Sequence, residues 1–278
     1  MGNIDNKKKR KMKGIILAGG NATRLYPNTA EVSKQLLPVY KAPMVFYPLN
    51  ILIKAGIEDI LIIVSPKHSG RFLNLLEPMF RDYGIRILST VQEVPSGLPE
   101  AFKLGEGFIG DDDVCLILGD NIFEDSDTIV DAIKNFESGG HVFAKEVSDP
   151  ERFGVATVND EGVVTNIEEK PENPESNLAI TGAYIYDNRV VKNSKSLNPS
   201  ERGELEIVDL HNYYLNKGEL KMGIVDGAWI DAGTEDSYLD VCMLARERDL
   251  YSKFDQRIKD AIESGRARFK SNAKKMLK

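Results

Sequence analysis

The most constraining feature of the chain is an apolar run that stops at two glycines. Residues 14–34 read GIILAGGNATRLYPNTAEVSK, in which the apolar stretch breaks at Gly19 and Gly20 before the cations Arg24 and Lys34 follow. A buried strand that ends at paired glycines exposes backbone N–H groups with no side chain in the way, and such a concavity binds phosphate. Two cations in the same short segment suit a polyphosphate better than a single phosphate. The pattern therefore predicts a strand followed by a polyphosphate-binding loop.

Apolar runs alternate with helical patterns through the first half of the chain. Strands are predicted at 14–18, 59–65, 85–91 and 114–118, and helices at 44–55, 70–83 and 98–108. Continuous apolar strands joined by helices are typical of a mostly parallel sheet that is covered on both faces. We therefore expect an α/β fold whose ligands bind outside the carboxyl ends of the strands.

The second half contains shorter strand candidates separated by turn residues. They cover 141–147, 154–158, 163–168 and 183–186, and we expect them to extend the same sheet and to form a lid over its carboxyl edge. A helix is predicted at 206–217, an extended segment at 221–225 and a short acidic turn at 229–233, after which the chain reads as helical to its end. Because there is no internal repeat and no linker rich in Pro, Gly and Ser, we predict one domain at residues 13–245 followed by a helical tail at 246–278.

Composition restricts the class of protein. The 278 residues are 42% hydrophobic and 28% charged, which is ordinary for a soluble globular enzyme. No apolar run approaches the roughly 20 residues that a membrane-spanning helix needs. Only two cysteines occur, Cys115 and Cys242, which indicates a reducing cytoplasm rather than a disulfide framework. Three histidines without a CxxC pair argue against a zinc site.

Charge is distributed unevenly along the chain. The first thirteen residues carry six Lys or Arg against one Asp, a net charge of +5, so the remaining residues carry −12 of the total of −7. A run such as KKKRK is able to contact nucleic acid or an anionic surface. We favour the simpler interpretation of a solvated, disordered leader over residues 1–12, with neither nucleic acid nor a membrane as partner.

Two isolated carboxylates stand where ligand-binding residues are expected. Asp120 follows the apolar strand VCLIL within GDN, and Asp231 lies in WIDAGT between an apolar residue and a glycine turn. An Asp after a buried strand is often only a turn residue or a helix cap, so either residue alone is weak evidence. Together at one sheet edge beside a phosphate loop they suit Mg²⁺, an ion that is usually shared with substrate phosphates.

Further cations accompany these carboxylates. Lys34 lies in SKQLLP, Lys170 in EEKP and Arg202 in SERGELE, and each taken alone reads as a surface cation. Lys170 is the more informative, because Pro171 fixes the turn that follows it. With Arg24, these residues divide into one group for a triphosphate and another for an acceptor phosphate.

Several ordered motifs connect these residues to a known family. The segments GIILAGGNATRLYP, SKQLLPV, LGDNIF, DPERFGVA, IEEKP, TGAYIYD, ERGELEI and WIDAGT resemble those of bacterial glucose-1-phosphate thymidylyltransferases, which belong to the sugar-1-phosphate nucleotidyltransferase superfamily. The resemblance runs in order over residues 13–245. It implies a Rossmann-like three-layer α/β domain with a mixed, mostly parallel sheet, the nucleotide-diphospho-sugar transferase fold.

The resemblance also implies roles for individual residues. Arg24 would grip the β- and γ-phosphates and help pyrophosphate leave, and Lys34 would contact the α-phosphate. Asp120 and Asp231 would hold Mg²⁺. On the nucleotide side, Gln92 and Gly97 would read the pyrimidine edge, and the full set of implied contacts is Leu17, Gly19, Gly20, Thr23, Gln92 and Gly97. On the sugar-phosphate side, Glu169 would accept hydrogen bonds from sugar hydroxyls, and Lys170 and Arg202 would clamp the phosphate. The full set there is Gly154, Glu169, Lys170, Ile180 and Arg202.

The implied reaction is Mg²⁺-dependent transfer of a nucleotidyl group from dTTP to a sugar 1-phosphate. Glucose 1-phosphate is the expected acceptor, and the family resemblance implies a homodimer or homotetramer in the cytoplasm. The acceptor is already an anionic nucleophile, so neither a general base nor a covalent enzyme intermediate is needed. The remaining task is to bring two anions together, which positioning and charge neutralisation accomplish.

Three alternatives are weighed against this reaction. A uridylyl- or cytidylyltransferase for another sugar phosphate remains open, because thymine differs from uracil by one methyl group, which a hydrophobic pocket distinguishes by only about 1–3 kcal/mol. A glycosyltransferase that uses a finished nucleotide sugar would need a metal motif such as Asp-x-Asp, whereas GDN supplies one acid. A non-catalytic regulatory subunit should have lost at least one charged site residue, yet all are present: Arg24, Lys34, Asp120, Lys170 and Asp231.

Departures from the family pattern adjoin the nucleotide. Ala22 stands where many thymidylyltransferases have glycine, which adds a methyl group close to the phosphates. The segment SGLPEAF has Ser96, Pro99 and Glu100 where the thymidylyl pattern more often reads DGLAQAF. The helical region that forms a regulatory nucleotide-sugar site in long-form relatives is short and highly charged here after Arg246, so we infer no feedback inhibition from it.

Overall fold

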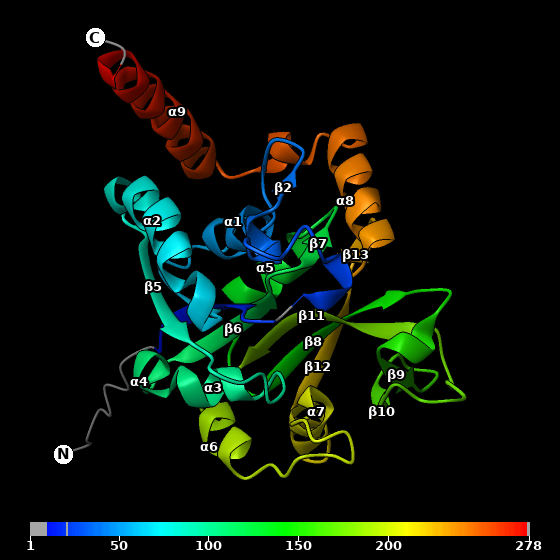
Figure 1. Ribbon diagram of the computed structural model, residues 1–278. Coiled ribbons are helices and arrows are strands. Elements are labelled where there is room, and N and C mark those ends of the chain that lie inside the picture. Colours follow the sequence, from blue (N-terminus) through cyan, green and yellow to red (C-terminus); the bar gives the residue numbers. More distant parts are fainter. Residues whose placement is uncertain (1–9, 21, 277–278) are drawn as a thin grey trace, which may run out of the picture.

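A mixed sheet organises the fold of the computed structural model, which describes residues 10–20 and 22–276 (Figure 1). The described part forms a nine-stranded sheet in the order β10-β9-β11-β6-β1-β4-β5, in which β8 also pairs with β11 and β12 with β8. Four neighbouring strands are parallel: β6 (Asp113–Leu118), β1 (Met12–Ala18), β4 (Asp59–Val64) and β5 (Arg86–Val91), which forms an edge of the sheet. The remaining strands are β8 (Gly140–Glu146), β9 (Gly154–Val158), β10 (Val164–Glu169), β11 (Leu178–Tyr186) and β12 (Leu220–Ile224).

Helices cover both faces of this sheet. Consecutive residues of β1, Ile15 and Ile16, belong to two different apolar clusters because side chains alternate between the faces of a strand. One face carries α1 (Phe46–Lys54), α2 (Ser69–Phe80), α5 (Asp127–Lys134), α8 (Glu235–Glu247) and α9 (Gln256–Met276). The other carries α3 (Glu100–Leu104), α4 (Glu106–Ile109), α6 (Arg189–Lys195) and α7 (Ile207–Leu215) (Figure 1). The predicted three-layer α/β fold with a mixed sheet is confirmed.

Both ends of the described chain join this architecture. Most of the predicted leader lies outside the described residues, but Met12 already opens β1, and Arg10 forms an ion pair with Asp113 at 3.0 Å. The predicted helical tail is interrupted by a short 3₁₀ turn at Leu250–Lys253, after which Ile258 and Ile262 of α9 enter the apolar cluster that also contains α2. None of the helices in the described ranges is both long and apolar enough to cross a bilayer.

Several predicted elements differ from the structure for reasons of packing. The single helix predicted at 98–108 is divided into α3 and α4 at Gly105, where an added Cβ would lie 3.0 Å from Ile15 Cδ1 of the sheet. The strand predicted at 183–186 begins earlier, at Leu178. Helices α5 and α6 and the strand pair β2 (Pro38–Val39) and β3 (Ala42–Pro43) were not predicted at all. Local periodicity is short in each of these segments, so long-range contacts decide their conformation.

The most consequential difference concerns residues 229–233. The predicted acidic turn is a strand, β13 (Trp229–Asp231), which pairs antiparallel with another unpredicted strand, β7 (Asn121–Phe123). Three residues are too few to show a strand periodicity, and the partner is remote in sequence. This small ladder brings the segment that carries Asp231 to the end of β6.

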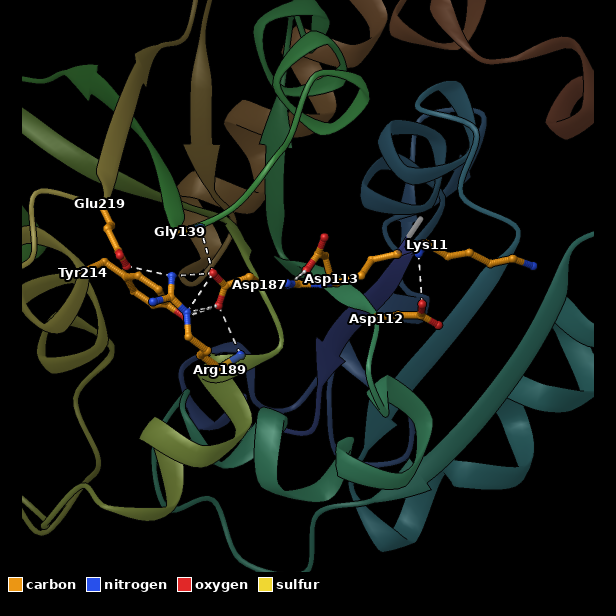
Figure 2. Close-up of polar contacts among 9 residues, drawn as sticks. Lys11, Asp112, Asp113, Gly139, Asp187, Arg189, Tyr214 and Glu219 are labelled. Atoms are coloured by element: carbon orange, nitrogen blue, oxygen red, sulfur yellow. Dashed lines mark hydrogen bonds and ion pairs between the residues drawn. The ribbon is translucent and has the colours of Figure 1, made fainter. Parts of the chain in front are cut away.

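A buried carboxylate ties the opposite end of β11 to its neighbours (Figure 2). Asp187 is 1% exposed, and it accepts hydrogen bonds from the Gly139 N–H at 2.8 Å, the Tyr214 hydroxyl at 3.1 Å and Arg189 Nη2 at 2.6 Å. Arg189 also pairs with Glu219 at 2.7 Å. Burial alone would raise the pKa of Asp187, but these donors, Arg189 foremost, lower it below the usual value. The network therefore stabilises the sheet end that lies away from the glycine loop.

Candidate active site

The loop after β1 has the open backbone expected from its glycines. No other described residue lies within 4 Å of a Cβ added to Gly20, apart from its chain neighbours, and Ala22 adopts a left-handed φ of +46°. Gly19 plays a different part, because an added Cβ would lie only 2.7 Å from Oε1 of Gln92. The chain then enters a 3₁₀ turn that carries Arg24. Gly20 thus leaves backbone uncovered for a ligand, while Gly19 permits close packing against Gln92.

A cavity of about 230 Å³, called the loop cavity here, opens where β1 and β6 end. The nucleotide-side residues Leu17, Gly20, Gln92 and Gly97 line it, together with Lys34, Asp120 and the methyl-bearing Ala22. Thr23 lies elsewhere, in the wall of a larger adjoining hollow of about 850 Å³ that shares Gly20, Ala22 and Lys34 with the loop cavity. The structure thus gathers four of the six residues assigned to the nucleotide into one cavity, with Gly19 packed against Gln92 and Thr23 lining the neighbouring hollow.

Position 97 requires glycine because the backbone of Leu205 approaches it closely. Its φ is +111°, and a Cβ added to it would lie 2.1 Å from the carbonyl oxygen of Leu205. The two residues form a parallel bridge, supported by a 2.8 Å hydrogen bond from the Leu205 N–H to the Ser96 carbonyl. This bridge fastens the loop-cavity wall to the segment that carries Arg202.

Replacing Gly97 by Ala should therefore detach these two segments. The left-handed backbone costs about 1–3 kcal/mol for a residue with a Cβ, and the collision with Leu205 adds to that cost. We expect a lower thermal melting temperature and a higher KM for the nucleotide. Gly203→Ala is the matched control, since Gly203 also has a positive φ, +77°, but its added Cβ would have no contact within 4 Å in the part of the chain that the structure describes. Equal effects of the two variants would contradict the bridge.

A second cavity of about 270 Å³ adjoins the first and is called the hairpin cavity, because β9 and β10 form part of its wall. It shares Leu98, Leu118 and Glu204 with the loop cavity. Asp231 lines this cavity. So do all the residues assigned to the sugar phosphate: Gly154, Glu169, Lys170, Ile180 and Arg202. Two adjoining cavities therefore separate the two predicted groups of residues.

Charge in the hairpin cavity is concentrated around Glu169. Its carboxylate lies 3.6 Å from Lys170 Nζ and 3.5 Å from Arg202 Nη2, and Arg202 also pairs with Glu206 at 2.8 Å. Burial raises the pKa of Glu169 and Glu206 raises it further, whereas Lys170 and Arg202 oppose the rise. Both cationic side chains are nearly half exposed, at 46% and 43%. They remain accessible to an anionic ligand while Glu169 faces the inside of the cavity.

The two predicted metal carboxylates come together between the cavities. The Ala232 N–H donates to the Asp120 carbonyl at 2.9 Å, and Asp231 stands opposite Asn121 in the β7–β13 ladder. Lys34 Nζ holds Asp120 Oδ2 at 2.5 Å. Arg24 reaches the same point from the glycine loop, since its Nη2 lies 3.1 Å from a Cβ added to Gly233 and Asp231 Oδ1 lies 3.2 Å from it.

The electrostatics of this pair favour a cation. Burial, followed by the neighbouring Asp120, raises the pKa of Asp231 to about 6, although Lys34 and Arg24 oppose the shift. Two carboxylates without further acidic or histidine ligands suit Mg²⁺, which takes one or two carboxylates and completes its shell with water and substrate phosphates. The described residues contain no cluster of three or more His, Cys, Asp or Glu that would enclose a metal alone. Asp120 and Asp231 thus fit a magnesium ion shared with a substrate.

Some residues of the site were not singled out from the sequence. Asn121 is 2% exposed, and its Oδ1 accepts from Trp229 Nε1 at 2.7 Å and from the Gly182 N–H at 2.8 Å, which fastens the β7–β13 ladder to β11. His211 lines the hairpin cavity with its Nδ1 2.6 Å from the Tyr186 hydroxyl, and no described residue bonds its Nε2. The motifs LGDNIF and WIDAGT contain Asn121 and Trp229, but their pairing has no local signal.

Comparison with known proteins supports this picture. Residues 13–248 match the nucleotidyl transferase family. A glucose-1-phosphate thymidylyltransferase of Neisseria meningitidis is 52% identical over 81% of this chain and 80% of its own, and one of Mycolicibacterium smegmatis is 45% identical over 86% and 84%. A solved Bacillus anthracis structure assigned to the same activity superposes with a TM-score of 0.79 at 43% identity, covering 85% of this chain and 96% of its own. The chain therefore belongs to the nucleotidyl transferase family.

Proposed function

We propose that this enzyme transfers the thymidylyl group of dTTP to glucose 1-phosphate and forms dTDP-glucose and pyrophosphate. Relatives that are 45–52% identical carry the name glucose-1-phosphate thymidylyltransferase. The observation that carries the proposal is the pair of adjoining cavities. Lys34 and Asp120 line the loop cavity, and Asp231 lines the hairpin cavity together with the cations Lys170 and Arg202. A reaction between two anionic substrates needs such an arrangement, because their mutual repulsion must be neutralised at the point where they meet.

The chain's own residues supply positioning and charge. A phosphate oxygen of the sugar 1-phosphate attacks the α-phosphorus of dTTP in line, the α–β phosphoanhydride bond breaks, and pyrophosphate leaves on the opposite side. Lys34, at the end of the loop cavity, neutralises the α-phosphate, and Arg24 stabilises the departing β- and γ-phosphates. Holding both reactants in this orientation removes much of the entropic barrier.

Asp120 and Asp231 would hold Mg²⁺ between the substrates. The ion would offset the charge that develops on the α-phosphate and on the leaving pyrophosphate. Lys34 pairs with Asp120 Oδ2 at 2.5 Å and the Asn121 side-chain amide donates to Asp120 Oδ1 at 3.2 Å, so both contacts hold this carboxylate in one orientation toward Asp231. The two carboxylates match the number that Mg²⁺ takes from a protein when phosphates complete its shell.

The hairpin cavity would bind the acceptor. Lys170 and Arg202 clamp the phosphate of glucose 1-phosphate, and Glu169 accepts hydrogen bonds from sugar hydroxyls. Gly154 leaves room beside this carboxylate, since a Cβ there would lie 3.5 Å from Glu169 Oε2 and 3.8 Å from the Cβ of Ile180. A side chain at this position would therefore reduce the space for the sugar ring.

The proposed cellular compartment and oligomeric state rest on the cysteines and on the family resemblance. Cys115 and Cys242 are free thiols, which suits the reducing cytoplasm. We expect a homodimer or homotetramer, on the strength of the family resemblance. Sedimentation of the purified protein would measure this state directly.

Pyrophosphate release tests the proposed reaction. The assay combines dTTP, UTP, CTP, ATP and GTP with several sugar 1-phosphates in the presence of Mg²⁺. We expect the highest kcat/KM for dTTP with glucose 1-phosphate, and a lower value for UTP, which lacks the thymine methyl group and carries a 2′-hydroxyl that dTTP does not have. Absence of release with every pair would refute the enzyme function, and a preference for purine nucleotides would refute the roles given to Gln92 and Gly97.

A further inference from the structure

Gln92 forms part of the wall of the loop cavity. It follows β5, is 3% exposed, and anchors its backbone through a 2.9 Å hydrogen bond from its N–H to the Val64 carbonyl. Its side-chain carboxamide has two different ends, a carbonyl oxygen that accepts and an amide nitrogen that donates. Which end faces a ligand therefore decides which hydrogen-bonding pattern the cavity recognises.

Glu100 decides the orientation of this carboxamide. Gln92 Nε2 donates to Glu100 Oε2 at 2.5 Å, and the same oxygen accepts from the Ser96 N–H at 3.3 Å. A carboxylate only accepts hydrogen bonds, so a reversed carboxamide would place two acceptor oxygens against each other. The nitrogen of Gln92 is therefore held on the Glu100 side.

The carbonyl oxygen of Gln92 is left for a ligand. It lies beside Gly19, where an added Cβ would be 2.7 Å away, and no described residue donates a hydrogen bond to it. The second N–H of Nε2 also remains available, since Glu100 accepts only one. The side chain thus offers an adjacent acceptor and donor in a defined order.

We propose that Glu100 makes the base pocket selective for thymine and uracil over cytosine by fixing the orientation of Gln92. The inference rests on the proposed function, in which a pyrimidine nucleotide fills the loop cavity. Thymine and uracil present an N3–H donor next to the O4 acceptor, which matches the Oε1 acceptor and the Nε2 donor of Gln92. Cytosine presents an N3 acceptor next to an N4 amino group, so both contacts become unfavourable.

Without Glu100, the carboxamide is free to rotate. The reversed form would donate to cytosine N3 and accept from its N4 amino group, which makes the pocket tolerant. Glu100 is thus a positioning residue that acts through Gln92, and it discriminates by excluding the orientation that cytosine needs. A bidentate pair of this kind distinguishes bases by about 10- to 100-fold.

The test compares UTP with CTP, which share the same ribose, using glucose 1-phosphate as acceptor. Wild-type enzyme should show a large UTP/CTP ratio of kcat/KM, and Glu100→Ala should reduce it by about tenfold or more. The KM for glucose 1-phosphate should stay unchanged. Glu100→Gln, which keeps an acceptor oxygen and the shape of the side chain, should give an intermediate ratio and carries the test if the alanine variant does not fold.

Two further variants separate positioning from a general structural effect. In a Gln92→Ala background, Glu100→Ala should leave the UTP/CTP ratio unchanged, because the residue through which it acts is gone. Glu106→Ala is the matched control, since Glu106 opens the next helix and pairs with the exposed Lys195 at 2.6 Å. It should alter neither rate nor ratio.

The possible failures are distinct. A wild-type enzyme that releases pyrophosphate from CTP as readily as from UTP would overturn the selectivity while leaving the transfer reaction intact. An unchanged ratio in Glu100→Ala, or an equal change with and without Gln92, would overturn the positioning role. No release from any nucleotide would instead refute the proposed function itself.

Discussion

Asp231→Asn should reduce kcat by at least about 100-fold, the loss typical of removing one electrostatic contact to a charged transition state. The carboxylate stands with Asp120 where the two cavities meet, and the amide lacks the charge needed to hold Mg²⁺. Asp120→Asn should have a similar effect and should also release Lys34 from its 2.5 Å ion pair. Steady-state pyrophosphate release with saturating substrates and Mg²⁺ measures the change.

The fold of these variants should remain intact. The Asp231→Asn substitution removes one of two neighbouring negative charges, so the metal-free variant should melt no lower than the metal-free wild type. Asp226→Asn serves as the matched control, because Asp226 is an exposed acid in the same segment and lines neither cavity. It should retain activity within about twofold, since surface changes are usually small in effect. Near-wild-type turnover by Asp231→Asn would contradict the metal assignment.

Asp187→Ala should destabilise the protein by about 3 kcal/mol, because it leaves buried donors without an acceptor. The donors are the Gly139 N–H and the Tyr214 hydroxyl, and Arg189 loses its buried partner (Figure 2). Urea denaturation followed by circular dichroism measures the free energy of unfolding. Glu219→Ala is the matched control, since Glu219 pairs with the same Arg189 from a side chain that is 39% exposed, and it should cost at most about 1 kcal/mol.

The effect of Asp187 should depend on pH. Its pKa in the fold is lowered below that of the unfolded chain, so its stabilisation is fully present above about pH 4 and is lost as the pH falls through the folded pKa. The difference in unfolding free energy between wild type and Asp187→Ala should therefore shrink in acid. A difference that grows as the pH falls, or a larger cost for Glu219→Ala, would show that the network is not governed by the Asp187 charge.

The proposed base selectivity depends on a residue at which this sequence differs from the thymidylyltransferase pattern. The segment SGLPEAF differs from the thymidylyl pattern at Glu100, which placed an unusual carboxylate next to the nucleotide. The structure gives that carboxylate a partner, Gln92 Nε2 at 2.5 Å. Ala22 also differs from the family pattern. It adopts a φ of +46° and lines the loop cavity, where its methyl group would lie close to the expected position of the phosphates.

The parts of the site that could be predicted are those with local signals. Paired glycines after an apolar strand identified the loop, because only glycine leaves backbone N–H groups so exposed. Ordered motifs identified the family, and the family match over residues 13–248 confirms it. The roles of individual residues stay predictions, but the structure brings Lys34 and Asp120 to one cavity and Glu169, Lys170 and Arg202 to the other.

The sequence by itself determined the α/β class, the glycine loop and the chemical types of residue that a nucleotidyl transferase requires. Only the tertiary structure decided how they meet: that β13 pairs with β7 and brings Asp231 to Asp120, that Gly97 is pressed against Leu205, and that Glu100 holds Gln92. The physical reason is the range of the interactions. A strand of three residues or a single buried hydrogen bond leaves no periodicity in its own segment, because its stability comes from a partner elsewhere in the chain.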